Sequence, residues 1–91
     1  MRYVVKYDIR VPGDLKSIDA PSRKKIRSAI EAKLIAQPEL FGKPLRYSLA
    51  GFRVLRVGRY RVVYLIKQLA VLVLLIGDRK YVYREAFKRF G

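Results

Sequence analysis

The 91-residue sequence contains no cysteine and no histidine. Disulfide bonds and thiol catalysis are therefore excluded, as is every metal site or acid–base pair that depends on imidazole. Acidic residues are scarce, because seven aspartates and glutamates stand against 21 lysines and arginines. The formal net charge of +14 adds nothing to the stability of the fold, since like charges repel one another. An excess of this size is typical of proteins that bind a polyanion: nucleic acid, an acidic membrane surface or an acidic protein.

Long apolar segments are also lacking. The longest run, over residues 69–76, is far shorter than the roughly 20 residues that span a bilayer. Residues 1–6 are interrupted by charge and do not form the apolar centre of a signal peptide. We therefore expect a soluble, cytoplasmic protein that does not enter a membrane. Because 52% of the residues are hydrophobic, we expect one packed core and a single domain over residues 1–91.

The pattern of apolar residues predicts a fold of the α+β class. Strands are expected at 2–8, 45–49, 52–57, 60–67 and 69–76, with a loop at 41–44. A helical turn at 14–18, a helix over 20–37 capped by Asp19 or Ser22, and a short helix over 81–90 complete the chain. Residues 69–76 are apolar on both faces, which favours a central strand.

The predicted order of elements is βααββββα, or βααβββα if residues 45–49 are irregular. We expect an antiparallel sheet of about four strands, with the two N-terminal helices on one side and a short C-terminal helix. The helices are expected to gather on one face of this sheet.

Positive charge is concentrated in the second half of the chain. Between Glu39 and Asp78 there is no carboxylate. The basic residues of this half are Lys43, Arg46, Arg53, Arg56, Arg59, Arg61, Lys67, Arg79, Lys80, Arg84, Lys88 and Arg89. Arginine predominates, and its planar guanidinium group can bind phosphate through two hydrogen bonds at once.

A hairpin turn at Gly58 and Arg59 would place Arg56 directly opposite Arg61. Like charges at opposed positions of two strands destabilise a sheet, unless an anion lies between them. Either arginine alone could simply extend into solvent. The pair, joined by Arg79 and Tyr83 from the following segment, favours an anion-binding site. Tyr60 and Tyr64 fall on the other face of the same strand, where we expect them to pack in the core.

Four stretches, taken in order, resemble the RelE/ParE superfamily of toxins, and in particular its RelE-like branch. Residues 14–16 read DLK, residues 43–51 read KPLRYSLAG, residues 52–64 read FRVLRVGRYRVVY, and residues 76–84 read IGDRKYVYR. The resemblance implies the small α+β fold shared with microbial ribonucleases. It also implies a type II toxin–antitoxin system, in which an antitoxin is encoded alongside the toxin.

The resemblance further implies an activity and a set of site residues. RelE-type toxins cut mRNA in the ribosomal A site, using the RNA 2′-hydroxyl as nucleophile and neither a metal nor a cofactor. By position, the catalytic residues of that group correspond to Arg56, Arg61, Arg79 and Tyr83. Two departures from the family pattern stand out: Asp78 replaces a histidine found in many members, and the lysines of the hairpin are missing.

The chemistry of 2′-hydroxyl attack requires a base, stabilisation of the phosphorane and protonation of the 5′-oxygen. Without histidine, tyrosine is the remaining base, and guanidinium groups favour its phenolate form. Tyr83 fits this role best, although it could instead anchor the last helix. Arg56 and Arg61 would stabilise the phosphorane. Arg79 would clamp the phosphate or assist the leaving oxygen, unless Asp78 pairs with it. The residues expected to bind RNA outside the catalytic set are Lys43, Arg46, Arg53, Arg59, Lys80 and Arg84.

Three functions remain open on these residues. The first is a ribosome-dependent mRNA endonuclease that inhibits translation, with mRNA and ribosomal RNA as partners. The second is a ParE-type inhibitor of DNA gyrase or a catalytically silent homologue, and the third is a plain RNA-binding module. All three are compatible with an acidic antitoxin, for which the helix at 20–37 and the sheet edge at 2–8 are the expected docking places.

Overall fold

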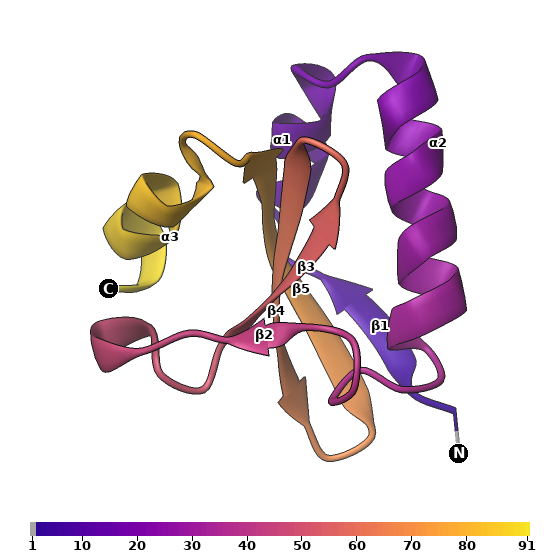
Figure 1. The fold of residues 1–91 in the computed structure, drawn as a ribbon, viewed down its shortest axis with the longest axis vertical. Helices are drawn as coiled ribbons and strands as arrows, with labels where there is room; N and C mark the ends of the chain where they lie inside the picture. The colour runs from indigo at the N-terminus through magenta and orange to yellow at the C-terminus, as the bar shows by residue number, and fades with distance from the viewer. Residues whose placement is uncertain (1) are drawn as a thin grey trace.

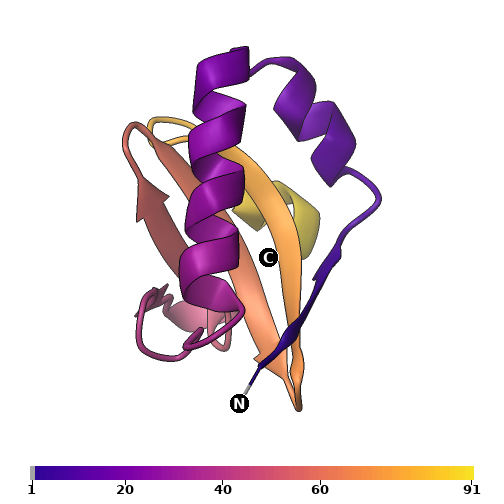
Figure 2. The same cartoon turned by 90° about the vertical axis from the view of Figure 1, so that its right-hand side faces the viewer.

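The computed structural model describes residues 2–91 as a five-stranded sheet with helices on both faces (Figures 1 and 2). Its strands are β1 (Val4–Tyr7), β2 (Lys43–Pro44), β3 (Arg53–Val57), β4 (Tyr60–Lys67) and β5 (Ala70–Asp78). Its helices are α1 (Val11–Lys16), α2 (Ala20–Ala29) and α3 (Val82–Phe90). A π-helical turn, Ile30–Leu34, extends α2, and a 3₁₀ turn, Tyr47–Leu49, follows β2. The order of the strands in the sheet is β1-β5-β4-β3-β2.

The α+β class and the central position of β5 are confirmed, with differences in detail. Strand β1 pairs with β5 in parallel, so the sheet is mixed, whereas all other pairs are antiparallel. The expected loop at 41–44 is partly wrong, because Lys43 and Pro44 pair with β3. Of the two alternatives for residues 45–49, the irregular segment is correct and the strand is not. Tyr47 adopts a left-handed φ of 60° and begins a 3₁₀ turn, which interrupts the extended chain.

Helices α1 and α2 cover one face of the sheet. Asp19 caps α2 by accepting a hydrogen bond of 3.0 Å from the Ser22 amide. Ile26, Ile30 and Leu34 recur every four residues. Their side chains are at most 2% exposed, and they pack in a core that includes the sheet. The helical spacing seen in the sequence therefore identifies the buried side of this helix correctly.

Helix α3 lies on the opposite face, which corrects the expectation that all helices gather on one side (Figure 2). Val82 and Ala86 are buried against Val63 of β4 and Leu75 of β5. The physical reason is the apolar character of β5 on both faces, since each face needs its own cover. Within residues 2–91, no helix is long and apolar enough to cross a lipid bilayer.

The hairpin between β3 and β4 has the expected register. Gly58 takes a left-handed φ of 59° in the turn, which glycine adopts without steric cost. Arg56 then pairs with Arg61. Tyr60 and Tyr64 point to the α2 side and are buried, as predicted. The two arginines therefore share the face of the sheet that carries α3.

Candidate functional site

A groove of about 440 Å³ brings most of the predicted catalytic residues together. Arg56 and Arg61 line it from the hairpin, and Tyr83 lines it from the first turn of α3. Lys43, expected to bind RNA, lines it from β2. The remaining lining residues are Leu40, Phe41, Gly42, Val54 and Leu55. The groove therefore joins three segments that are far apart in the sequence.

The two arginines of the groove have no carboxylate partner among residues 2–91. Arg61 donates from Nη1 to the carbonyls of Gly58 and Tyr60, at 2.9 Å each, which holds its guanidinium group beside the turn. Arg56 is exposed. Two opposed, unneutralised cations repel each other, and a bound anion would relieve that repulsion.

Arg79 is the one predicted catalytic residue that does not line this groove. It lies one residue beyond β5, is exposed, and donates its amide hydrogen to the carbonyl of Arg59 at 2.9 Å. Asp78 pairs with Arg59 and not with Arg79, because it accepts hydrogen bonds from the Arg59 guanidinium at 2.7 and 3.0 Å. The guanidinium group of Arg59, expected to bind RNA, is thus engaged with a carboxylate.

Asp78 also shapes the turn that leads to α3. Its carboxylate accepts the amide hydrogen of Lys80 at 2.8 Å, and its carbonyl accepts that of Tyr81 at 3.0 Å. The Lys80 amide, followed by the Arg59 guanidinium, lowers the pKa of Asp78 below its ordinary value. Hydrogen bonds from Ser22 lower the pKa of Asp19 in the same way.

Acid is expected to destabilise the fold through these two aspartates. Because the folded-state pKa of each is depressed, each contributes stability that is present above the unfolded value of about 3.9. That stability is lost as the pH falls through the folded-state pKa. The urea midpoint should therefore be steady near neutrality and fall below about pH 4. The fall should be smaller in Asp78→Asn, and equal acid dependence in both proteins would refute the role of Asp78.

Arg53, expected to bind RNA, instead holds the loop that precedes β2. Its Nη2 donates to the carbonyls of Glu39 and Gly42, at 2.7 Å each. The hydroxyl of Tyr64 donates to the carbonyl of Pro38 at 2.6 Å. A side chain at Gly42 would overlap the Tyr64 phenol, so only glycine fits there. Arg53 and Tyr64, which both belong to the sheet, thus hold the backbone of this loop in place.

The other predicted RNA-binding residues remain available at the surface. Arg46, Lys80 and Arg84 are exposed, and the Arg84 guanidinium lies 5.7 Å from the centre of the Tyr81 ring. Leu40 and Phe41 were not identified as site residues from the sequence. The available signal was an adjacent apolar pair at the start of a predicted loop, two residues before Lys43.

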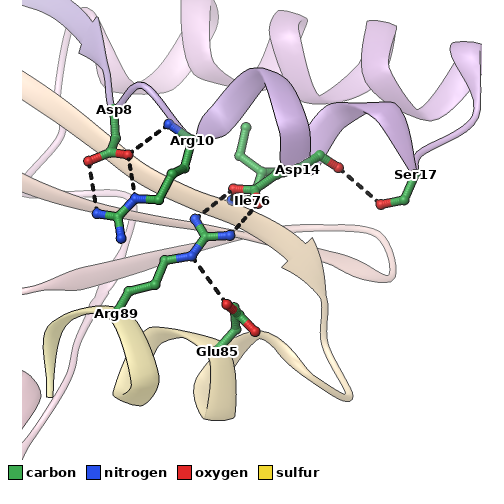
Figure 3. Close-up of polar contacts among 7 residues, drawn as sticks. All are labelled: Asp8, Arg10, Asp14, Ser17, Ile76, Glu85 and Arg89. Carbon is green, nitrogen blue, oxygen red and sulfur yellow. Dashed lines mark hydrogen bonds and ion pairs between the residues drawn. The ribbon is translucent and has the colours of Figure 1, made fainter.

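A partly buried ion pair joins α3 to α1 (Figure 3). Arg89 donates to both carboxylate oxygens of Asp14, at 2.6 and 3.2 Å, and the two side chains are only 14% and 8% exposed. Asp14 also accepts the amide hydrogen of Ile76 at 3.1 Å, and Glu85 accepts from Arg89 at 3.3 Å. These contacts fix the helix that carries Tyr83.

Comparison with known proteins places this chain in a family. The sequence model of a protein family, described as the ParE toxin of the type II toxin–antitoxin system parDE, matches residues 4–83. The chain belongs to this toxin family. A search of curated protein sequences found no significant match.

Solved structures of related toxins share the fold of this toxin. The toxin–antitoxin complex RelBE2 from Mycobacterium tuberculosis contains a chain with 28% identity and a TM-score of 0.81, over 87% of this chain and 93% of that one. A mutant of the Escherichia coli toxin RelE in the free state has 24% identity and a TM-score of 0.75, over 100% of both chains. The E. coli DinJ–YafQ toxin–antitoxin complex contains a chain with 16% identity and a TM-score of 0.64, over 91% of this chain and 99% of that one. The assignment to the RelE/ParE superfamily made from the sequence is therefore confirmed.

Proposed function

We propose that the toxin cleaves mRNA on the ribosome, in the cytoplasm, and so inhibits translation. The observation that supports this proposal is the groove shared by Arg56, Arg61 and Tyr83. It combines two cations without carboxylate partners among residues 2–91 with a group that can accept a proton. Those meet two of the three requirements for 2′-hydroxyl attack on a phosphodiester, the base and the stabilisation of the phosphorane.

The proposed reaction uses the RNA as its own nucleophile and no metal. The phenolic oxygen of Tyr83 is the acceptor for the proton of the 2′-hydroxyl, and the 2′-oxygen attacks the adjacent phosphorus. Arg56 and Arg61 stabilise the charge of the phosphorane with hydrogen bonds to its oxygens. The bond from phosphorus to the 5′-oxygen then breaks, leaving a 2′,3′-cyclic phosphate, and the 5′-oxygen takes a proton from water. Arg79, outside the groove, would bind a neighbouring phosphate together with Lys80.

Such a site gains most of its rate from correct placement of the RNA, which the ribosome would supply. The test is to express the toxin from a tightly repressed promoter in bacteria and to map the 5′ ends of cellular mRNA. Growth arrest with new 5′ ends inside translated codons is expected. Growth arrest with intact mRNA would contradict the proposal.

A second candidate function is inhibition of DNA gyrase. The observation that favours it is the match to the model of the ParE toxin, because ParE-type toxins act on gyrase. Incubation of purified toxin with gyrase and supercoiled DNA separates the two functions. Accumulation of cleaved DNA would support gyrase as the target, whereas normal supercoiling is expected if RNA is the target.

We also propose that an acidic antitoxin docks between α1 and α2. RelBE2 and DinJ–YafQ are described as toxin–antitoxin complexes. In the toxin, a groove of about 360 Å³ lies between the two helices, lined by apolar residues that include Leu15 and Ile26. Arg23 and Arg27 also line it. An amphipathic, acidic segment would match both its apolar surface and its charge.

Charge reversal in this groove is expected to weaken the antitoxin complex. Arg27→Glu should raise the Kd for the antitoxin about tenfold or more, because it opposes acidic side chains at the interface. Lys24→Glu is the matched control, since Lys24 is exposed on the same helix but does not line the groove. Titration calorimetry of both variants checks the prediction, and an equal loss in both would show that only overall charge matters.

A further inference from the structure

The groove has apolar side chains beside its arginines. Leu40 is 67% exposed and Phe41 is 38% exposed, and both line the groove that holds Arg56 and Arg61. Tyr83, which lines it from α3, is 44% exposed. Exposed apolar side chains cost solvation free energy, and when they gather beside a polar site they commonly contact a ligand.

The loop that carries Leu40 and Phe41 is fixed from beneath. Tyr64 is fully buried, and this burial raises the pKa of its phenol above the ordinary value. The hydroxyl therefore stays protonated and donates to Pro38, while Arg53 donates to the carbonyls on either side of the apolar pair. Two polar side chains of the sheet thus hold a loop in which Leu40 is largely exposed and Phe41 is partly exposed, with the Lys33 ammonium 5.6 Å from the centre of the Phe41 ring. This rigidity lowers the entropy cost of binding a ligand there.

We infer that Leu40 and Phe41 form a platform for one unpaired nucleobase, next to the phosphate bound by Arg56 and Arg61. The inference rests on the proposed action on RNA and adds to it the side chains that would hold one base beside the cleaved phosphate. Proteins that bind single strands combine a positively charged groove for the backbone with apolar or aromatic faces for the bases. A volume of about 440 Å³ lies in the range of small-ligand sites.

The groove matches a nucleotide, because a nucleotide has a charged phosphate at one end and an apolar base at the other. The phosphate is an anion and the base is a flat apolar face, and the ribose joins them at a fixed short distance. The groove offers cations and apolar side chains in the same volume. A base in a duplex is stacked on both sides and cannot reach such a platform, so the toxin is expected to prefer single-stranded RNA.

The test is the affinity of the full chain for a short 2′-O-methyl RNA, which lacks the nucleophile and cannot be cleaved. Phe41→Ala should weaken binding about 5- to 150-fold, the usual range for loss of one stacked base. Phe41→Tyr should restore the affinity. Leu69→Ala is the control, because Leu69 is 53% exposed and does not line the groove.

Abasic substitution, made at each position of the same oligonucleotide in turn, gives the decisive comparison. At one position, the effect of Phe41→Ala should disappear, because the base that it contacts is missing. If Phe41→Ala weakens all abasic oligonucleotides as much as the intact one, the platform is refuted even where Arg61→Ala still abolishes binding. If Arg61→Ala leaves binding unchanged, the proposed RNA groove itself is wrong. If Phe41→Ala spares RNA binding but weakens antitoxin binding, the platform belongs to the protein partner.

Discussion

Arg61→Ala is expected to lower the rate of mRNA cleavage by about 100- to 1,000-fold, because one donor to the phosphorane is removed. Tyr83→Phe is expected to lower it by about 100- to 10,000-fold, because the ring is kept but the proton acceptor is lost. Both residues line the same groove and act in the same step. The double variant should therefore cleave mRNA almost as fast as the less active of the two single variants. Single-turnover cleavage of a ribosome-bound mRNA measures all three rates.

Two control variants separate loss of chemistry from loss of structure. Tyr81→Phe removes the same hydroxyl two residues before Tyr83, from a side chain that is exposed and does not line the groove. Lys24→Ala removes a cation from α2 on the opposite face. Both should cleave at the wild-type rate. If Tyr81→Phe loses as much activity as Tyr83→Phe, the assignment of the base is wrong.

The second large effect is a loss of stability, expected when the ion pair between Arg89 of α3 and Asp14 of α1 is broken (Figure 3). Arg89→Met should lower the free energy of unfolding by about 1–3 kcal/mol, because it leaves the partly buried Asp14 carboxylate without its cation. For a domain of this size that is a large part of the total stability. Cleavage should fall as well, since α3 carries Tyr83. Urea denaturation at pH 7 measures the loss.

The double variant Asp14→Asn with Arg89→Met tests whether the unpaired Asp14 charge causes the loss of stability. It removes both charges and keeps an acceptor for the Ile76 amide, so it should recover much of the lost stability. Asp8→Asn is the control, because the Asp8–Arg10 pair is at the surface and such pairs contribute little. If the double variant is no more stable than Arg89→Met, an unpaired, partly buried charge is not the cause of the loss.

Features that depend on neighbouring residues could be predicted from the sequence. The turn at Gly58 determines the register of the hairpin, which places Arg56 opposite Arg61 and directs Tyr64 into the core. The four-residue spacing of Ile26 and Ile30 identifies the buried side of α2. Local backbone geometry and periodicity determine both results, and they involve few long-range choices.

Features that depend on distant contacts could not be predicted. Arg53 was expected to bind RNA because it is a cation in a basic hairpin, but the carbonyls that it contacts belong to a loop 11 and 14 residues away. Asp14 and Arg89 are separated by 75 positions, and their pairing requires α1 and α3 to be placed first. Arg79 was expected in the groove by position in the family motif, yet the chain turns after Asp78 and places it elsewhere.

The central claim is that the toxin cuts mRNA with its own side chains while the ribosome positions the RNA. The most direct measurement uses purified toxin, an mRNA and purified ribosomes, with the products located by primer extension. We expect cleavage between nucleotides of the A-site codon, products that end in a 2′,3′-cyclic phosphate, and no cleavage by Tyr83→Phe. Intact mRNA in the complete reaction, or equal cleavage by Tyr83→Phe and the wild-type toxin, would contradict this account.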